Sequence, residues 1–133
     1  WFDGDAGIDV PPHERGVGLV FQSLALFPHM TALDNVAYGM PRTWPIHERQ
    51  ARARSLLERM KVAHVGDRRP STFSGGEAQR VAMARAFGRS PRVLLLDEAF
   101  SAMDEPLRRA LQADVRAYVA ETGIPTLQIT HQR

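Results

Sequence analysis

Residues 92–100, with the sequence RVLLLDEAF, contain a short aliphatic run that ends at two adjacent carboxylates, Asp97 and Glu98. The run predicts a buried strand over residues 92–96. In open α/β sheets, ligands bind at the carboxyl ends of the strands, which is where these two acids would lie. Adjacent carboxylates repel each other, so a site that holds both gives one to a cation and the other to a proton or a water. The alternative is a polar strand end that caps the next turn.

Two further strands are predicted outward from this one. Residues 16–22, GVGLVFQ, are typical of a strand buried on both faces, and Gln22 ends it with a side chain that both donates and accepts. Residues 126–130, TLQIT, predict another strand, which is followed by His131. Each of these terminal polar residues is, taken alone, an ordinary strand-end side chain.

Helical patterns separate the predicted strands. A helix after Pro45 has one apolar stripe formed by Ala53, Leu56, Leu57 and Met60. Asp104 is suited to cap a last helix, and Gly123 is suited to end it. The apolar side of that helix is predicted to carry Leu107, Ala110, Leu111, Val115 and Tyr118. The order of strands and helices indicates an α/β domain with an inserted helical subdomain.

The start of the middle helix is unusual, because two glycines follow its cap. Ser74 is a good N-cap, and Glu77 stands three positions later, which is a capping-box pattern. Gly75 and Gly76 leave the backbone amides without shielding side chains, so an anion can approach this helix start closely. An ordinary capped helix is the alternative.

Composition limits the class of protein. The chain has 133 residues, 44% hydrophobic and 24% charged, which indicates one soluble globular domain. Its net charge is +2 and its arginines are interleaved with acids, so no nucleic-acid partner is expected. There is no cysteine, which excludes disulfides and thiolate metal sites. No apolar stretch reaches membrane-spanning length, and the missing initiator Met indicates a fragment.

Four motifs in order, VGLVFQ, FSGGEAQRVAMARA, RVLLLDEAFSAMD and LQITH, resemble the nucleotide-binding domain of ATP-binding cassette (ABC) proteins over nearly the whole chain. The resemblance implies a P-loop NTPase core, incomplete at both ends, with an inserted helical subdomain. It divides residues 1–133 into core strands up to the Q-loop (1–22), a helical subdomain with the signature motif (23–89), and a core segment with the Walker B motif, D-loop and H-loop (90–133).

The resemblance also implies roles at the sheet edge. Gln22 corresponds to the Q-loop glutamine, which contacts Mg²⁺ and water and senses the transport partner. Asp97 corresponds to the Walker B aspartate at the magnesium, and Glu98 to the general base that orients the attacking water. His131 corresponds to the switch histidine at the γ-phosphate of ATP.

In the same family, the glycine-rich helix start meets the γ-phosphate of ATP held by the opposite subunit of a dimer. The residues that correspond to this signature motif are Ser74, Gly75, Gly76 and Glu77. Residues 101–104, SAMD, resemble the D-loop, which includes Ser101 and Asp104. An amide-rich helix start stabilises added negative charge, so the physical reading agrees with this role.

Three departures from the family pattern stand out. Phe73 replaces the usual Leu, and Glu77 replaces the usual Gln, which places a carboxylate near a triphosphate. No G-x-x-x-x-G-K-[ST] phosphate loop occurs in the 133 residues, and Lys61, the only lysine, has no glycine-rich setting. We therefore expect the chain as given neither to bind ATP tightly nor to hydrolyse it, and to expose apolar edges of strands 17–21 and 93–96.

Residues 24–40, LALFPHMTALDNVAYGM, are similar to the segment after the Q-loop in bacterial importer ATPases of the molybdate, sulfate, polyamine, iron and sugar group. The implied protein is a membrane-associated cytoplasmic subunit that hydrolyses ATP with Mg²⁺ and energises solute import. Its implied partners are a second ABC subunit, a membrane permease and, indirectly, a solute-binding protein. A soluble non-transport ABC ATPase is the alternative, as is a catalytically weak ABC-like regulatory partner, for which Glu77 is the hint.

Overall fold

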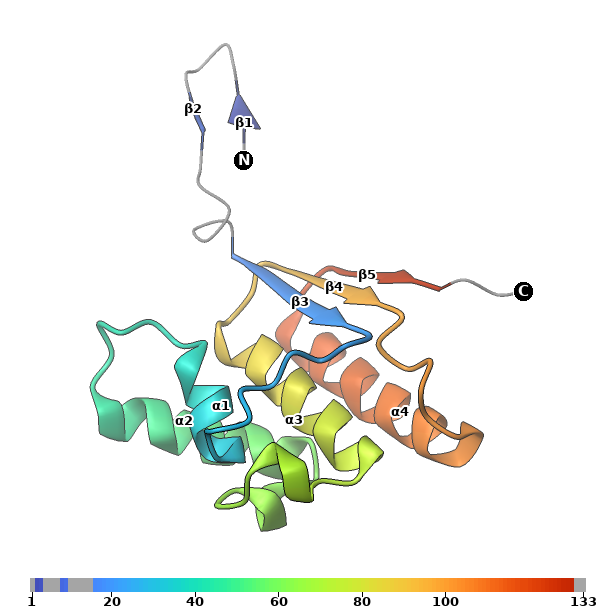
Figure 1. Ribbon diagram of the computed structural model, residues 1–133. Coiled ribbons are helices and arrows are strands. Elements are labelled where there is room, and N and C mark those ends of the chain that lie inside the picture. Colours follow the sequence, from blue (N-terminus) through green and yellow to red (C-terminus); the bar gives the residue numbers. More distant parts are fainter. Residues whose placement is uncertain (1, 4–7, 10–15, 131–133) are drawn as a thin grey trace.

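A three-stranded parallel sheet organises the chain in the computed structural model, which describes residues 2–3, 8–9 and 16–130 (Figure 1). Strand β4 (Val93–Asp97) lies between β3 (Val17–Phe21) and β5 (Thr126–Ile129), and helix α4 (Glu105–Thr122) connects β4 to β5. The three predicted strands are confirmed, with bounds that differ by one residue at their ends. Two short antiparallel strands, β1 (Phe2–Asp3) and β2 (Ile8–Asp9), precede this sheet.

The helices lie on one face of the parallel sheet (Figure 1). On that face Val20, Leu94 and Leu96 are buried. On the other face the alternate side chains remain accessible to solvent, with Leu19 45% and Phe21 47% exposed. The predicted burial of residues 16–22 on both faces is therefore wrong for the described chain, because burying both faces of a strand needs a packed layer on each side.

The pairing of the strands corrects a second expectation. Strand β4 was expected to expose an apolar edge, but it is hydrogen-bonded to β3 on one side and to β5 on the other. Strand β3 lies at one edge of this sheet, as predicted, and β5 lies at the other, where all four of its residues are exposed. Leu127 and Ile129, 57% and 42% exposed, continue the accessible apolar face of β3.

The helical part is built from α1 (Ala32–Tyr38), α2 (Ile46–Arg59) and α3 (Gly75–Gly88), with 3₁₀ turns at Ala63–Val65 and Pro70–Thr72. These three helices pack against one another, and α3 also packs against β3. The apolar stripe predicted along α2 is confirmed, because the side chains of all four of its members are buried: Ala53, Leu56, Leu57 and Met60.

Helix α4 confirms its predicted ends and part of its predicted apolar side. The Asp104 side chain accepts a hydrogen bond from the Leu107 backbone N–H at 3.1 Å, and Gly123 ends the helix in the left-handed conformation, with a φ of 69°. Leu111, Val115 and Tyr118 are buried. Leu107 and Ala110 are exposed, contrary to the prediction. Leu107 faces the start of α3 at Gly76, which has no side chain to cover it.

Asn35 is a fully buried amide that fixes the chain before α1. Its Oδ1 accepts a hydrogen bond from the Phe27 N–H at 2.8 Å, and its Nδ2 donates to the carbonyls of Phe27, Met30 and Thr31 at 3.2, 3.3 and 2.9 Å. The carbonyls of Thr31 and Phe27 also accept backbone hydrogen bonds, from the Asn35 and Met30 N–H groups, so the groups that depend on the Asn35 side chain are the Phe27 N–H and the Met30 carbonyl.

Replacing this amide tests its contribution. We expect Asn35→Ala to lower the free energy of unfolding by about 2 kcal/mol, because it leaves the half-buried Phe27 N–H and Met30 carbonyl without their partner. Urea unfolding followed by circular dichroism measures the change, with Ser55→Ala, at an exposed position of α2, as the control. A loss equal to that of the control would show that water satisfies these backbone groups.

Candidate functional site

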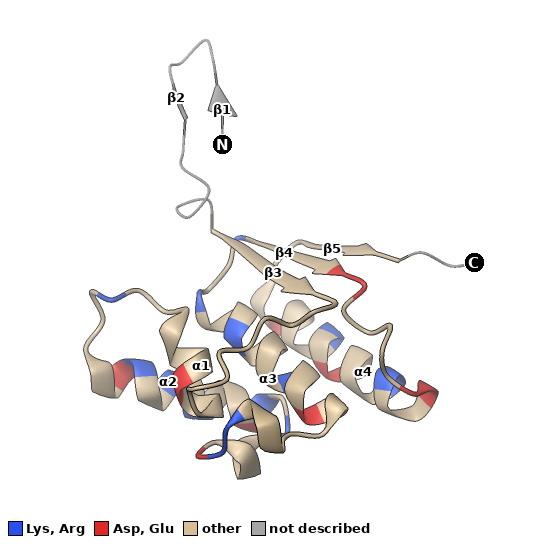
Figure 2. Ribbon diagram, viewed as in Figure 1, with Lys and Arg blue, Asp and Glu red and all other residues tan. Residues whose placement is uncertain are grey.

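The two carboxylates Asp97 and Glu98 lie where β4 ends, and Figure 2 shows this acidic end of the strand. Glu98 adopts a φ of 49°, a left-handed conformation that costs a non-glycine residue about 1–2 kcal/mol. Three hydrogen bonds hold it there. Its N–H donates to the Ile129 carbonyl at 3.0 Å, and its own carbonyl accepts from the Ser101 N–H at 3.2 Å and the Ser101 Oγ at 2.9 Å. A strained, firmly held acid at this edge is typical of a functional residue.

An open cavity of about 480 Å³ lies beside Glu98. Its lining includes Ser101, two arginines of α4, Arg108 and Arg116, and Thr130 after β5. The Asp97 and Glu98 residues are only half-buried, so water and ligands have access to both carboxylates. The arrangement places a base within reach of solvent at the edge of a rigid sheet.

Gln22 reaches the same edge from the neighbouring strand. Phe21 pairs with Asp97 in the parallel register, so Gln22 follows β3 as Glu98 follows β4. The Gln22 side chain is exposed. The sheet therefore brings together three of the predicted site residues, whereas His131 lies outside the described residues.

The donors at this edge suit a cation that shares its coordination with a ligand. Among the described residues, no group of three or more His, Cys, Asp or Glu side chains is placed to hold a metal ion. Mg²⁺ does not need such a group, since it takes one or two carboxylates and fills its other positions with water and phosphate oxygens. The Asp97 carboxylate and the Gln22 amide oxygen fit that requirement.

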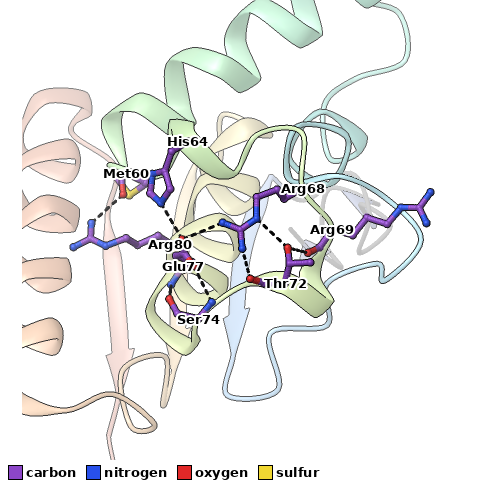
Figure 3. A network of polar contacts seen from close by, with 8 residues as sticks. All are labelled: Met60, His64, Arg68, Arg69, Thr72, Ser74, Glu77 and Arg80. Atoms are coloured by element: carbon purple, nitrogen blue, oxygen red, sulfur yellow. Dashed lines mark hydrogen bonds and ion pairs between the residues drawn. The ribbon is translucent and has the colours of Figure 1, made fainter.

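The predicted capping box at the start of α3 is confirmed (Figure 3). Ser74 Oγ accepts a hydrogen bond from the Glu77 N–H at 3.1 Å, and Glu77 Oε1 accepts one from the Ser74 N–H at 2.8 Å. A Cβ atom added to Gly75 would meet nothing within 4 Å, and one on Gly76 would come no closer than 3.7 Å to Leu107. The fold does not require glycine at either position for space.

The Glu77 carboxylate also has two basic side chains as neighbours. Its Oε2 lies 2.9 Å from His64 Nε2 and 3.9 Å from Arg68 Nη1, both on the segment before α3 (Figure 3). The N–H of Ser74, followed by the contact with His64, holds the pKa of Glu77 below its ordinary value. The Glu77 carboxylate thus points back to its own N-cap, and Arg68 lies near enough to offset part of its negative charge.

The signature-like turn and the acidic sheet edge form two separate groups. Within the described part of the chain, no hydrogen bond or ion pair joins Ser74 or Glu77 to Asp97 or Glu98. One group offers backbone amides at a helix start, and the other offers carboxylates at the end of a strand. They present opposite electrostatic character on separate elements.

Three polar residues of α3 that the motifs did not single out bond this helix to other elements. The buried Gln79 donates to the carbonyl of Ala99, directly after Glu98. Arg80 donates to the Met60 carbonyl at 3.0 Å and to Asp114 of α4 at 2.7 Å. Arg85 donates to the carbonyls of Leu24 and Ala25. Polar side chains on a helix that is otherwise buried were the available signal, since buried polar groups need partners.

The charge on Glu77 is testable apart from its role as a cap. Glu77→Gln keeps the capping box but removes the negative charge beside His64 and Arg68. The pKa of Glu77 is lower in the folded chain than in the unfolded chain, where it is about 4.3. The ionised carboxylate therefore stabilises the fold fully above about pH 4.3, and this stabilisation is lost as the pH falls through the pKa of the folded chain. We expect the unmodified chain to have a larger free energy of unfolding in urea than Glu77→Gln at pH 6, and this difference to become smaller below about pH 4.

Glu48→Gln is the matched control, because Glu48 is the third residue of α2 but has no side-chain cap preceding it. A Glu77→Gln effect that does not change between pH 6 and pH 3 would contradict a stabilising charge.

Comparisons with known proteins agree with this arrangement. The sequence pattern of the family described as ABC transporter matches residues 3–101. The chain is 44% identical over 126 residues to the spermidine/putrescine import ATP-binding protein PotA of Roseobacter denitrificans, covering 94% of this chain and 35% of that protein. It is 44% identical over 122 residues to the molybdate/tungstate import ATP-binding protein WtpC of Archaeoglobus fulgidus, covering 92% of this chain and 50% of that protein.

A solved structure shows the same fold. It is a dimeric ATP-binding cassette in a post-hydrolysis state bound to ADP and Pi, which superimposes with a TM-score of 0.78 at 28% identity and covers 98% of this chain and 58% of that one. The chain thus spans between about a third and a little over half of these relatives. The match over residues 3–101 and the parallel sheet with its inserted helices show that the chain belongs to the ABC transporter family.

Proposed function

We propose that the protein containing this chain is an ATP-hydrolysing subunit that energises solute import through a membrane permease. The observation that carries the proposal is the acidic edge of the sheet, where Asp97 and the strained Glu98 lie beside Gln22. The relatives named above are import ATP-binding proteins, which supports the direction of transport. Sulfate/thiosulfate import ATP-binding protein CysA 2 of Agrobacterium fabrum, 43% identical over 136 residues, supports it as well.

Glu98 is the proposed general base. Its carboxylate accepts a proton from the water that attacks the γ-phosphorus of ATP. The new bond joins the water oxygen to phosphorus, the bond to the β,γ-bridging oxygen breaks, and ADP and phosphate are released. The hydrogen bonds from Ser101 and to Ile129 keep the Glu98 backbone fixed during this step.

Asp97 and Gln22 are proposed to hold Mg²⁺, which would neutralise charge on the phosphate oxygens. Gln22 is also proposed to orient the attacking water, since its amide both donates and accepts. His131 is proposed to hydrogen-bond the γ-phosphate. These assignments follow the family resemblance and are supported by the shared sheet edge of Asp97, Glu98 and Gln22.

The start of α3 is proposed to bind ATP held by a second subunit. Ser74, Gly75 and Gly76 supply a hydroxyl and uncovered amides for the γ-phosphate, and Glu77 maintains that turn through its capping box. The separation of this turn from Asp97 and Glu98 supports a site completed by another chain. Because the Glu77 carboxylate bonds to its own N-cap, its presence in place of Gln is not an argument for the alternative of a catalytically weak regulatory partner.

The D-loop, the subdomains and the membrane partners complete the proposal. Of the two proposed D-loop residues, Ser101 bonds to the Glu98 backbone and Asp104 caps α4. The proposed parts of the chain are the core strands up to the Q-loop (1–22), the helical subdomain (23–89) and the second core segment (90–133).

Across residues 2–3, 8–9 and 16–130, no helix combines the length and apolar character needed to cross a membrane. From its likeness to import ATP-binding proteins, the subunit is proposed to lie at the inner membrane face through a permease, with a solute-binding protein acting indirectly.

The general base is tested by Glu98→Gln in the full-length protein. We expect ATP binding to persist while steady-state phosphate release falls by about 10²–10⁴-fold, because the amide cannot take the proton from water. Glu58→Gln, at an exposed position of α2, is the control and should leave the rate unchanged. Unchanged phosphate release by Glu98→Gln would remove this residue from the role of base.

The helix start is tested by Gly75→Leu. A side chain fits there without a clash, so we expect thermal stability to be kept or raised. ATP-driven dimer formation should weaken by about tenfold or more, because the side chain covers amides that meet the phosphate. Light scattering reports the dimer, and nucleotide titration of the monomer reports binding within one subunit. Equal losses in both measurements would place the signature turn and the nucleotide on the same subunit.

A further inference from the structure

The two residues that closely follow Gln22 have an unusual backbone. Leu24 and Ala25 adopt φ values of 59° and 49°, a left-handed conformation that L-residues with side chains seldom take. The Leu24 N–H donates to the Phe21 carbonyl at 3.1 Å and the Ala25 N–H to the Ser23 carbonyl at 2.7 Å. Two consecutive residues of this kind persist only where the surroundings hold them.

Arg85 of α3 provides that hold. Its Nη2 donates to the Leu24 carbonyl at 2.6 Å and its Nη1 to the Ala25 carbonyl at 2.8 Å. The same guanidinium lies 5.7 Å from the centroid of the Phe27 ring. A planar fork can bond two neighbouring carbonyls at once, which a lysine ammonium does not reproduce. Burial lowers the pKa of Arg85, so the carbonyls and the ring replace water around this cation.

Gln22 is therefore anchored on both sides. Phe21, before it, is paired with Asp97 in the sheet, and Leu24, two residues after it, is bonded to Arg85. Only Gln22 and Ser23 lie between these anchors. Asn35 holds the next part of the same segment at Phe27, but that contact is five residues from Gln22.

We propose that Arg85 is a positioning residue that holds Gln22 at the sheet edge through the backbone of Leu24 and Ala25. This inference rests on the proposed role of Gln22 in ATP hydrolysis. It also gives Gln22 a direct mechanical link to α3, the helix whose first turn carries Ser74.

A kinetic cycle tests whether Arg85 acts through Gln22. In the full-length protein we expect Arg85→Gln to lower kcat about tenfold while the KM for ATP changes by less than about twofold, because binding contacts stay intact. Arg85→Lys should retain part of the rate. The double variant Arg85→Gln with Gln22→Ala should be no slower than Gln22→Ala alone. If the two losses multiply instead, Arg85 acts independently of Gln22 and the inference is overturned.

Hydrogen exchange supplies a measurement that needs no ATP hydrolysis. With Arg85→Lys, the amides of residues 22–27 should exchange about tenfold faster, while those of α2 keep their rates. Unchanged exchange at residues 22–27 would overturn the positioning role, whatever the protein hydrolyses. If exchange is faster in Arg85→Lys but Gln22→Ala hydrolyses ATP at the unmodified rate, the positioning of this segment by Arg85 is supported and the catalytic role of Gln22 is refuted.

Arg54→Gln, at an exposed position of α2, is the control for loss of an arginine and should change neither measurement. If Arg85→Gln does not fold, which its urea unfolding curve would show, the same cycle is carried out with Arg85→Lys.

Discussion

The burial of α3 under the sheet is the constraint on which the rest of the structure depends. This helix has apolar neighbours on most sides, so each polar side chain that leaves it must find a partner inside the protein. Gln79 finds the carbonyl after Glu98, Arg80 finds Asp114, and Arg85 finds the backbone after Gln22. These contacts make one helix the common support of the helical part, of α4 and of two strand ends.

The chemistry follows from what that support presents at its surface. The sheet edge offers two carboxylates, one of them held in a strained conformation by β5 and by Ser101. The start of α3 offers uncovered amides, with Glu77 turned back on its cap and paired with His64. Negative phosphate oxygens are repelled by the first surface unless a cation intervenes, and are attracted by the second. The two surfaces thus have the opposite electrostatic character that the proposed phosphate site requires of its two halves, and among the described residues no hydrogen bond or ion pair joins Ser74 or Glu77 to Asp97 or Glu98.

Local features of this fold were predictable from the sequence, and features set by distant contacts were not. The strands, the Ser74 capping box, the Asp104 cap and Gly123 depend on residues a few positions apart, and the structure confirms them. Burial of β3 on both faces was wrong because it depends on which layers cover the sheet. The burial predicted for Leu107 was wrong, since its neighbour on α3 is Gly76, which has no side chain to cover it. The link from Arg85 to Leu24 spans 61 positions, so no local pattern could indicate it.

The central claim is that each ATP site combines the acidic edge of one subunit with the helix start of another. Mixed dimers of the full-length protein test this directly, with ATP hydrolysis as the measurement. When Glu98→Gln is on one subunit and Gly75→Leu on the other, one site keeps both of its functional halves, and hydrolysis should persist. When both changes are on the same subunit, each site loses one half, and hydrolysis should be lost. The reverse, with no activity in the first dimer and activity in the second, would place both halves of a site on one subunit and contradict the account.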